Sequence, residues 1–455
     1  MATQIHAVQA VSSPRSDAPA LDVQQFINER GISGVQWLTV ALCFLIVFID
    51  GYDTAAAGYI APSLSRDWGV AAPMLKPMMS AALIGLAIGA IGVGPIADRF
   101  GRRKVLIGSL ALFGVFSLAS AWAYDIVSIS VLRLLTGIGL GAAMPNAITL
   151  TSEYCPARHR SKLTMAMFCG FTLGSASGGF VAARLIGEYG WQSVLIVGGV
   201  APLLLVPVLI ALLPESLQYL VVRRGGAGVP ALLKRMDRSA RLDERIRTTV
   251  PEIGKLKTDS AVAVLFSPGY TIGTVALWAT YFCGLLTIYL ITSWLPTLVS
   301  NAGLPIAKAS QIGGMFMFGG ALGCLLMGVV MDRYDPHRAI AWAYSISAVL
   351  LLALAQSSGD LSDMGALVFA AGLFINAGQS ALLALAAGFY PTQGRATGVA
   401  WMNGIGRFGG IFGAYFGGTL LGLGWNFAAI VSALAVPALL AATAIWIKGL
   451  QRAPG

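Results

Sequence analysis

Long apolar segments separated by short polar loops recur along almost the whole chain. Each segment is long enough to cross the roughly 30 Å hydrocarbon core of a membrane as a helix, at a rise of about 1.5 Å per residue. Twelve spans are predicted, at residues 36–61, 78–97, 105–123, 126–150, 163–186, 193–213, 270–299, 308–331, 338–357, 364–389, 396–421 and 425–447. This pattern predicts an all-α polytopic membrane protein with twelve transmembrane helices.

The spans fall into two groups of six. One long polar stretch, residues 214–269, separates a bundle at 36–213 from a second bundle at 270–447, and it contains short amphipathic patterns such as Val229–Met236. We interpret this stretch as a cytoplasmic linker. Residues 1–35 lack the apolar core of a signal peptide, so we expect a disordered cytoplasmic tail there. Residues 448–455 form a short C-terminal tail.

Two loops of the first half recur in the second half. The loop at Gly94–Arg103 is matched by Gly328–Arg338, and the loop at Tyr154–Arg160 is matched by Tyr390–Arg395. Both matches are displaced by about 235 residues. Two unrelated loops that recur after nearly the same number of residues indicate a parallel duplication of six helices. In transporters built this way, the substrate site lies near the midplane between the two halves.

Composition and charge agree with this class. The chain is 56% hydrophobic and only 11% charged, which is more apolar surface than a soluble domain needs. A net charge of +10 is compatible with a nucleic-acid partner, but placing both termini in the cytoplasm puts most of the 30 lysines and arginines on the cytoplasmic side. The charge therefore indicates membrane orientation and not nucleic-acid binding.

Motifs of enzymes and metal sites are not found. The five cysteines are scattered, with no CxxC pair and no partnering histidines, so we expect neither a disulfide framework nor a metal site. No P-loop and no plausible arrangement of nucleophile and base is present either. An enzyme is therefore not expected.

Two aspartates, Asp50 and Asp53, lie three residues apart inside the first span. A carboxylate at mid-membrane depth costs about 2.5–3.5 kcal/mol on insertion scales, so such groups usually face a polar interior and carry function. Positions i and i+3 share one helix face, so we interpret the two acids as one proton-coupling site. Desolvation and like-charge repulsion both favour a bound proton there. A structural cap or salt bridge is the alternative.

Two arginines within spans are the natural partners of these acids. Arg133, in the fourth span, reaches a similar depth, and an unpaired guanidinium there would be as costly as an unpaired acid. We therefore expect an Asp–Arg contact that links proton loading to helix movement. Arg407, in the eleventh span, has a planar fork that matches a carboxylate, so we expect it to hold the carboxylate of a substrate. Structural pairing is the alternative for both.

Further candidates for a substrate site lie at a similar depth. Asn376 and Gln379, at i and i+3 in the tenth span, are candidates for hydrogen bonds to ring hydroxyls. Aromatic side chains that are candidates for a slot around a ring are Trp278, Tyr281, Phe282, Phe168, Phe171 and Trp401. Packing within the membrane or anchoring at its surface is the alternative for the aromatic residues.

Glycines four residues apart predict close helix packing. The small-residue spacing that lets membrane helices approach one another occurs at Gly406 and Gly410, at Gly409 and Gly413, and also at Gly85 and Gly89. Glycines close to Arg407 would also let the eleventh span bend or slide.

Several of these segments resemble the major facilitator superfamily, a family of transporters built from two six-helix bundles. The resemblance rests on Gly94–Arg103 with its degenerate copy, on Arg133–Gly141 and on Pro214–Ser216. Within that superfamily, Asp50–Asp53 and the segment Gly394–Arg407 resemble the aromatic acid:proton symporters. Those proteins import benzoate-type and hydroxybenzoate-type acids into bacteria.

The resemblance also implies a cytoplasmic gate. In the superfamily the Gly94–Arg103 motif is a gate latch, and Asp98 and Arg102 match its charged positions. Glu153, at the end of the fourth span, is its expected partner, and Asp332 and Arg395 hold the corresponding places in the second half. We expect these residues to govern the conformational equilibrium more than substrate contact.

The sequence therefore predicts a symporter of the bacterial inner membrane that imports small aromatic carboxylates such as hydroxybenzoates by alternating access. Protons are the expected coupling ion, no cofactor is expected, and the protein is expected to be monomeric in the lipid bilayer. A transporter or exporter of another organic anion is one alternative. A non-transporting membrane sensor is another, although the chain offers no long soluble domain for it.

Overall fold

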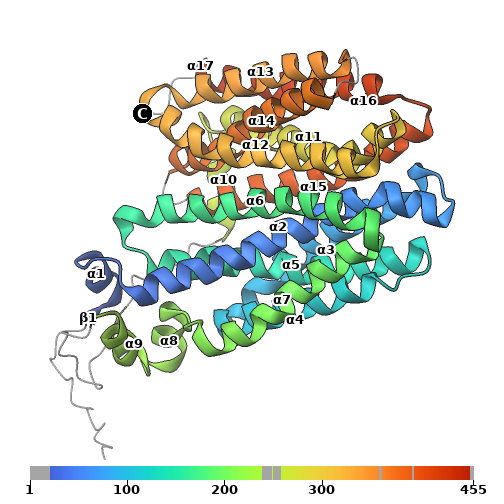
Figure 1. Ribbon diagram of the computed structural model, residues 1–455. Helices are drawn as coiled ribbons and strands as arrows, with labels where there is room; N and C mark the ends of the chain where they lie inside the picture. Colours follow the sequence, from blue (N-terminus) through green and yellow to red (C-terminus); the bar gives the residue numbers. More distant parts are fainter. Residues whose placement is uncertain (1–20, 238–247, 250–257, 358–360, 392–393, 451–455) are drawn as a thin grey trace, which may run out of the picture.

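The computed structural model describes residues 21–237, 248–249, 258–357, 361–391 and 394–450. Most of these residues form helices in two bundles that lie one above the other in Figure 1. The N-terminal bundle consists of α2 (Gly34–Trp68), α3 (Lys76–Phe100), α4 (Arg102–Ser120), α5 (Ile126–Tyr154), α6 (Ala157–Tyr189) and α7 (Gln192–Leu212). The C-terminal bundle consists of α11 (Thr271–Asn301), α12 (Ile306–Arg333), α13 (Pro336–Ala355), α14 (Leu361–Phe389), α15 (Arg395–Gly422), α16 (Phe427–Ala433) and α17 (Ala435–Leu450).

Each predicted span coincides with helix in the structure. Eleven helical segments of the described chain are long and apolar enough to cross a membrane, and α15, which carries Arg407, is a further long helix packed among them. The last predicted span is divided into α16 and α17. Pro437 explains the division, because a proline has no amide hydrogen to donate to the carbonyl of Ala433 one turn earlier.

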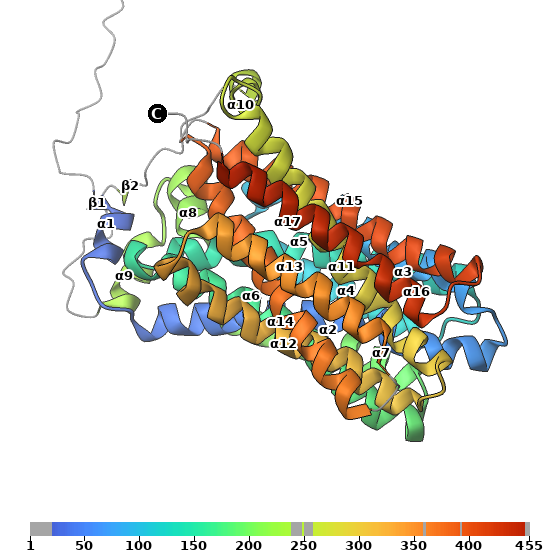
Figure 2. The same cartoon turned by 90° about the horizontal axis from the view of Figure 1, so that it is seen from above.

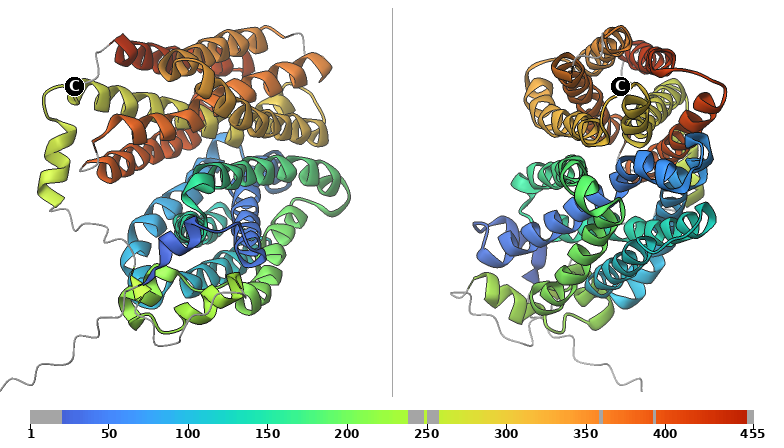
Figure 3. Two further views of the ribbon diagram at one scale, coloured as in Figure 1. Left: turned by 90° about the vertical axis from the view of Figure 1, so that its left-hand side faces the viewer. Right: turned by 45° about the vertical axis from the view of Figure 1, so that its right-hand side comes forward.

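The two bundles repeat one packing pattern, as the duplicated loops predict. In the N-terminal bundle α2 packs on α6, α3 on α5, and α4 on α7. The corresponding helices of the C-terminal bundle form the same pairs, namely α11 with α15, α12 with α14, and α13 with α17. The left-hand view in Figure 3 shows the two bundles as separate helix groups, one above the other. The prediction of a six-helix duplication is therefore confirmed.

Glycines bring the backbones of paired helices together. A Cβ on Gly85 or Gly89 of α3 would overlap backbone atoms of Leu134 and Ile138 on α5. On α15, a Cβ on Gly409 or Gly413 would likewise overlap the backbone of α11. The close approach predicted from the glycine spacing is therefore present in both bundles.

The segment before the first span is structured where the structure describes it. Residues 21–22 form β1, which pairs in parallel with β2 (Thr248–Thr249) of the linker, and α1 (Val23–Asn28) follows. Val23, Phe26 and Ile27 are buried in one cluster with residues of α8 (Leu217–Arg224) and α9 (Val229–Met236). The expectation of disorder is therefore wrong for residues 21–35, while residues 1–20 lie outside the described residues.

This error has a physical cause. Three apolar residues at i, i+3 and i+4 do not hold a helix of six residues in water, and the surface that covers them comes from the linker, some 200 positions later in the chain. Within that linker the amphipathic pattern at Val229–Met236 is confirmed as α9, and α10 (Thr258–Leu265) precedes the second bundle. Figures 1 and 2 show α1, α8 and α9 at one end of the molecule.

The two bundles are in close contact at the opposite end. A Cβ on Gly58 of α2 would overlap the carbonyl oxygen of Thr292 on α11, and Gly179 of α6 lies against Gly314 of α12. Trp294 of α11 and Lys76 of α3 both lie against Gly418 of α15. The bundles are thus in tight backbone contact at the end away from α1, α8 and α9.

Candidate functional site

Asp53 is held by a network inside the N-terminal bundle. The Arg133 Nη1 atom of α5 lies 2.9 Å from Asp53 Oδ2, and Arg133 Nη2 donates to the backbone carbonyl of Asp53 at 2.7 Å. The hydroxyl of Ser117 on α4 donates to the other carboxylate oxygen. Both members of the ion pair have 0% exposed side chains. The structure therefore contains an Asp–Arg contact as expected, formed by Asp53 and not by Asp50.

Asp50 has fewer partners, although its side chain is also buried. Its Oδ1 atom accepts a hydrogen bond from Thr54, one turn along the same helix, at 3.2 Å. Its Oδ2 atom has no hydrogen-bond partner among the residues that the structure describes. Buried polar oxygens are normally hydrogen-bonded, and those that are not call for an explanation such as a proton or a ligand.

Arg407 crosses from one bundle to the other. It lies about halfway along α15, is half-buried, and its Nη1 atom donates to the carbonyl oxygen of Leu86 on α3 at 3.2 Å. Arg407 forms no ion pair with an acidic side chain in the described part of the chain, but it lies within electrostatic range of Asp50. The guanidinium of Arg407 therefore has donors that Leu86 does not use.

Two tyrosines of α11 flank Arg407. Tyr281 packs on Gly406 and Tyr289 packs on Gly410, so their rings cover α15 on either side of the arginine. Tyr281 donates its hydroxyl to Asn403 Oδ1 at 2.9 Å, and Tyr289 lies within electrostatic range of both Asp50 and Arg407. Tyr281 was a predicted site residue, whereas Tyr289 and Asn403 were missed.

A signal for Tyr289 was present in the sequence. Tyr281 and Tyr289 are eight residues apart on α11, and Gly406 and Gly410 are four apart on α15. Such spacings place the two tyrosines on one face of α11 and the two glycines on one face of α15. What the sequence does not give is the pairing of α11 with α15, which is needed to bring the two faces together.

The predicted amide pair lies inside the C-terminal bundle. Asn376 donates to the carbonyl of Gly372 at 2.9 Å and lies against Gly320 of α12. Gln379 accepts a hydrogen bond from the Tyr344 hydroxyl at 2.8 Å. The two side chains are only 6% and 7% exposed. Both amides therefore join helices of one bundle in this arrangement, and their role toward a substrate stays a prediction.

The predicted aromatic slot is only partly assembled. Trp278 and Trp401 stack with ring centroids 5.9 Å apart, and Phe266, just after α10, packs edge-on against Trp278. This cluster lies toward the α10 end of α11 and α15, whereas Phe168 is half-buried on α6. The aromatic candidates thus belong to different surroundings, and Tyr281 is the one that lies beside Arg407.

Only some of the predicted gate residues form contacts with one another. Arg102 Nε lies 3.1 Å from Glu153 Oε1, and Glu153 Oε2 accepts a hydrogen bond from Ser216 at 2.6 Å. These contacts stay within the N-terminal bundle and its connection to α8. Asp98, Asp332 and Arg395 are exposed and join none of the ion pairs of the described chain. In this arrangement the charges of the two halves do not form a latch with each other.

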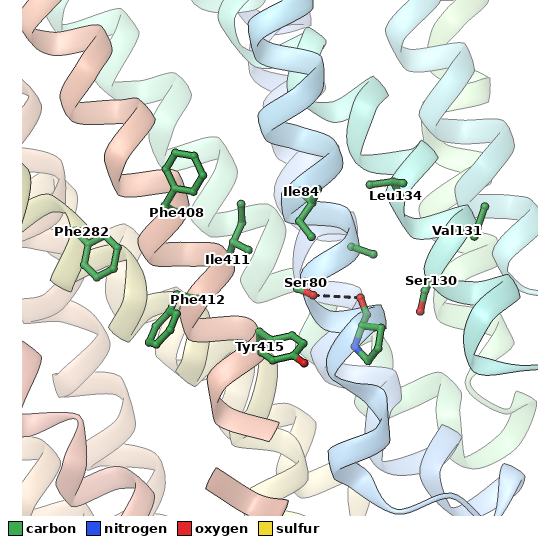
Figure 4. Close-up of a pocket in the computed structure, with 12 residues that line it drawn as sticks. Ser80, Ile84, Ser130, Val131, Leu134, Phe282, Phe408, Ile411, Phe412 and Tyr415 are labelled. Atoms are coloured by element: carbon green, nitrogen blue, oxygen red, sulfur yellow. Dashed lines mark hydrogen bonds between the residues drawn. The ribbon is translucent and has the colours of Figure 1, made fainter. Parts of the chain in front are cut away.

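One cavity of the described structure lies apart from the charged candidates. It is an apolar groove of about 670 Å³ between α3 and α5 of one bundle and α11 and α15 of the other (Figure 4). Phe282, a predicted aromatic candidate, contributes to its wall, but the charged candidates do not. The groove therefore lacks the convergent polar groups expected of a site for an organic anion.

Comparison with known proteins agrees with the fold. A family profile described as "Major Facilitator Superfamily" matches residues 43–371. The "4-hydroxybenzoate transporter PcaK" of Pseudomonas putida is 53% identical over 433 residues, covering 95% of this chain and 96% of the relative. A "Gallate transporter" of the same species is 48% identical, covering 96% of this chain and 97% of the relative.

Solved structures add the fold alone. The inward-open conformation of the xylose transporter XylE from E. coli matches with a TM-score of 0.71 at 18% identity, covering 90% of this chain and 96% of that chain. The relatives in sequence are named as transporters, not as enzymes. The chain belongs to the Major Facilitator Superfamily, in the same family as these aromatic acid transporters.

Proposed function

We propose that this protein is a proton-coupled importer of small aromatic carboxylates such as hydroxybenzoates. The named substrates of its relatives support the substrate class. The observation that supports the coupling is that Asp50, buried with one carboxylate oxygen lacking a hydrogen-bond partner in the described structure, lies within electrostatic range of Arg407 on the other bundle. Asp50 and the carboxylate of a substrate would then compete for one guanidinium.

Charge compensation couples the two loads. When Asp50 is ionised, its charge balances that of Arg407, and a second anion is disfavoured in the low-dielectric interior. When Asp50 takes up a proton, Arg407 is left uncompensated and binds the substrate carboxylate through its planar fork. The site is therefore close to neutral when both the proton and the substrate anion are bound, and also when neither is bound. These are the two states in which the bundles can rock.

The orientation in the membrane gives this cycle a direction. With both termini in the cytoplasm, the end at which the bundles are in tight contact faces outward. The present arrangement then corresponds to the inward-facing half of the cycle, in which Asp50 loses its proton and the substrate is released. Asp53 and Arg133, which are bonded within one bundle, move together and hold α2 against α5.

The hydroxyl groups of Tyr281 and Tyr289 suit the remainder of the ligand. Both rings lie beside Arg407, so an acid held there would have aromatic surface next to its own ring. The arrangement of these two phenols and Asn403 around the bound acid would determine which pattern of ring hydroxyls the site prefers.

The test is uptake of labelled 4-hydroxybenzoate into proteoliposomes with an alkaline interior. We expect accumulation that a protonophore abolishes and that an imposed membrane potential alone does not drive, because one proton with one monoanion moves no net charge. Liposomes without protein correct for diffusion of the neutral acid. Uptake that survives collapse of the pH gradient would refute coupling, and lack of binding across a series of hydroxybenzoates would refute the substrate class.

A further inference from the structure

The apolar groove between the bundles is open toward the membrane. Phe408 is 67% exposed, Val131 50% and Phe412 48%, although all three line the groove. Figure 4 shows Phe408, Ile411, Phe412 and Tyr415 along α15, with Ile411 and Tyr415 on the side toward Ser80 and Ile84 of α3. A groove of this kind on a membrane-spanning surface is filled by hydrocarbon, because water has no polar partner in it.

The hydroxyl hydrogens of the two serines of the groove are not available to a carboxylate. The Ser80 hydroxyl donates to the carbonyl of Lys76 at 3.1 Å, and the Ser130 hydroxyl donates to that of Ile126 at 2.6 Å. Both hydroxyls are thus used by their own helices. The groove therefore offers no donor to the carboxylate of the acids proposed as substrates, and its apolar walls suit a hydrocarbon chain.

One cation marks the outer rim of the groove. Lys76, the first residue of α3, places its Nζ atom 5.2 Å from the centre of the Tyr415 ring, and Tyr415 is part of the wall. Lys76 makes none of the ion pairs found in the described chain. A lysine and a tyrosine at the end of a membrane span are the residues that meet lipid headgroups.

The dimensions suit one leaflet. From Lys76 to Ile84 on α3, and from Tyr415 to Phe408 on α15, the walls extend for seven or eight residues, or about 10–12 Å at the rise of an α-helix. Half of a hydrocarbon core is about 15 Å thick. The groove therefore accommodates most of one acyl chain from the leaflet whose headgroups lie at the level of Lys76.

We propose that the groove binds one acyl chain of an anionic phospholipid whose phosphate pairs with Lys76. Because α3 and α5 form one wall and α11 and α15 the other, the site is complete only while the two bundles are in contact at this end. A bound lipid then stabilises the arrangement seen here at the expense of the one in which this end is open.

The experiment compares lipids added to the purified, delipidated full-length protein, followed by native mass spectrometry and by the apparent melting temperature. The probes are phosphatidylglycerol, phosphatidylcholine with the same acyl chains, and inorganic phosphate. We expect phosphatidylglycerol to bind and to raise the melting temperature, phosphatidylcholine to do so several-fold more weakly, and phosphate to have no effect. An equal effect of phosphate would overturn the role of the groove.

Variants locate the site. Lys76→Gln should weaken phosphatidylglycerol binding several-fold and remove the preference for it over phosphatidylcholine. Lys308→Gln is the matched control, since Lys308 is an exposed lysine at the same end of the molecule but outside the groove. If both lysine variants lose binding equally, the attraction is a general charge effect and the proposal is wrong.

Filling the groove tests the acyl chain. Val131→Trp should weaken binding of both phospholipids, and Val131→Phe provides a smaller change in case the tryptophan variant does not fold. If phosphatidylglycerol binds these variants as tightly as it binds the unmodified protein, the acyl chain lies elsewhere and the proposal fails.

Discussion

The interior of the N-terminal bundle and the interface between the bundles treat two neighbouring aspartates differently. Asp53 points into the bundle, where one of its carboxylate oxygens pairs with Arg133 and the other accepts a hydrogen bond from Ser117. Asp50 has one bond, from Thr54 of its own helix, and its second oxygen is buried without a partner in the described structure. Three residues on a helix turn by about 300°, which leaves the side chains about 60° apart and sufficient to reach different neighbours.

This difference separates a structural role from a coupling role. The hydrogen bonds around Asp53 all lie within one bundle. Their geometry therefore changes little when the bundles rock. The carboxylate of Asp50 has one oxygen without a hydrogen bond and lies near the other bundle, so its surroundings change whenever the interface changes. The two acids therefore form one cluster in sequence, but under the proposed function Asp50 is the one that we expect to exchange a proton with each turnover.

The largest effect is expected inside the bundle. Arg133→Ala leaves Asp53 buried without its charge partner, and breaking a buried pair in this way costs about 3–5 kcal/mol. We expect a large loss of folded protein, measured as the yield of monodisperse protein and as its melting temperature. Uptake by the cells should fall in parallel.

A double variant sharpens this result. Replacing both partners, as in Asp53→Leu with Arg133→Met, removes the unpaired charge, so folding should recover substantially. If the recovered protein also retains proton-coupled uptake, the pair is structural. If it folds but no longer couples, Asp53 and Arg133 take part in coupling, and the division between the two regions is too strict.

At the interface, Arg407→Ala should strongly weaken substrate binding and leave folding nearly unchanged. Loss of one partner of a desolvated, hydrogen-bonded charge pair costs about 2 kcal/mol or more, which corresponds to at least about 30-fold weaker binding. The hydrogen bond to Leu86 is worth only about 1 kcal/mol for stability. Calorimetric titration with 4-hydroxybenzoate, together with thermal melting, separates the two effects.

Arg407→Lys is the matched control for charge. A lysine keeps the positive charge and loses the bidentate fork, so we expect binding intermediate between that of the unmodified protein and that of the alanine variant. Binding by Arg407→Ala as tight as that of the unmodified protein would place the carboxylate site elsewhere.

Asp50→Asn should uncouple transport without blocking exchange. An asparagine resembles the protonated aspartic acid, so Arg407 stays available to the substrate at every pH. We expect counterflow of labelled for unlabelled substrate to continue, while accumulation driven by a pH gradient disappears. Accumulation that persists in Asp50→Asn would transfer the coupling role to another group, and Asp53→Asn tested beside it would show whether that group is Asp53.

The fold was largely predictable because its signals are local or repeated. Apolar length places the helices, and the loops at Gly94–Arg103 and Gly328–Arg338 reveal the duplication. The Asp–Arg contact was predictable in kind, since a buried guanidinium needs a partner, but not in its choice of Asp53. Orientation around the helix decides that choice, and an i, i+3 spacing alone does not resolve it.

Long-range packing explains the remaining differences. Asn376 and Gln379 were expected to face a substrate. In the structure Asn376 donates to Gly372 of its own helix and Gln379 accepts from Tyr344 of α13, so their role toward a substrate stays a prediction. The structured segment at 21–35 depends on linker helices far away in the sequence. Tyr289 was missed because only the contact of α11 with α15 places it beside Arg407.

The smallest effect is expected at Tyr289, and it tests how far the interface site extends. Tyr289→Phe keeps the ring on Gly410, so stability should be unchanged, and it removes only a hydroxyl near Asp50 and Arg407. A neutral hydrogen bond is worth about 0.5–1.5 kcal/mol, so KM for uptake should rise about two- to tenfold. Tyr124→Phe, an exposed tyrosine in a loop, is the control and should leave KM unchanged. An unchanged KM in Tyr289→Phe would limit the site to Asp50, Arg407 and Tyr281, whereas a change in the pH dependence of uptake would place the phenol on the proton side of the site.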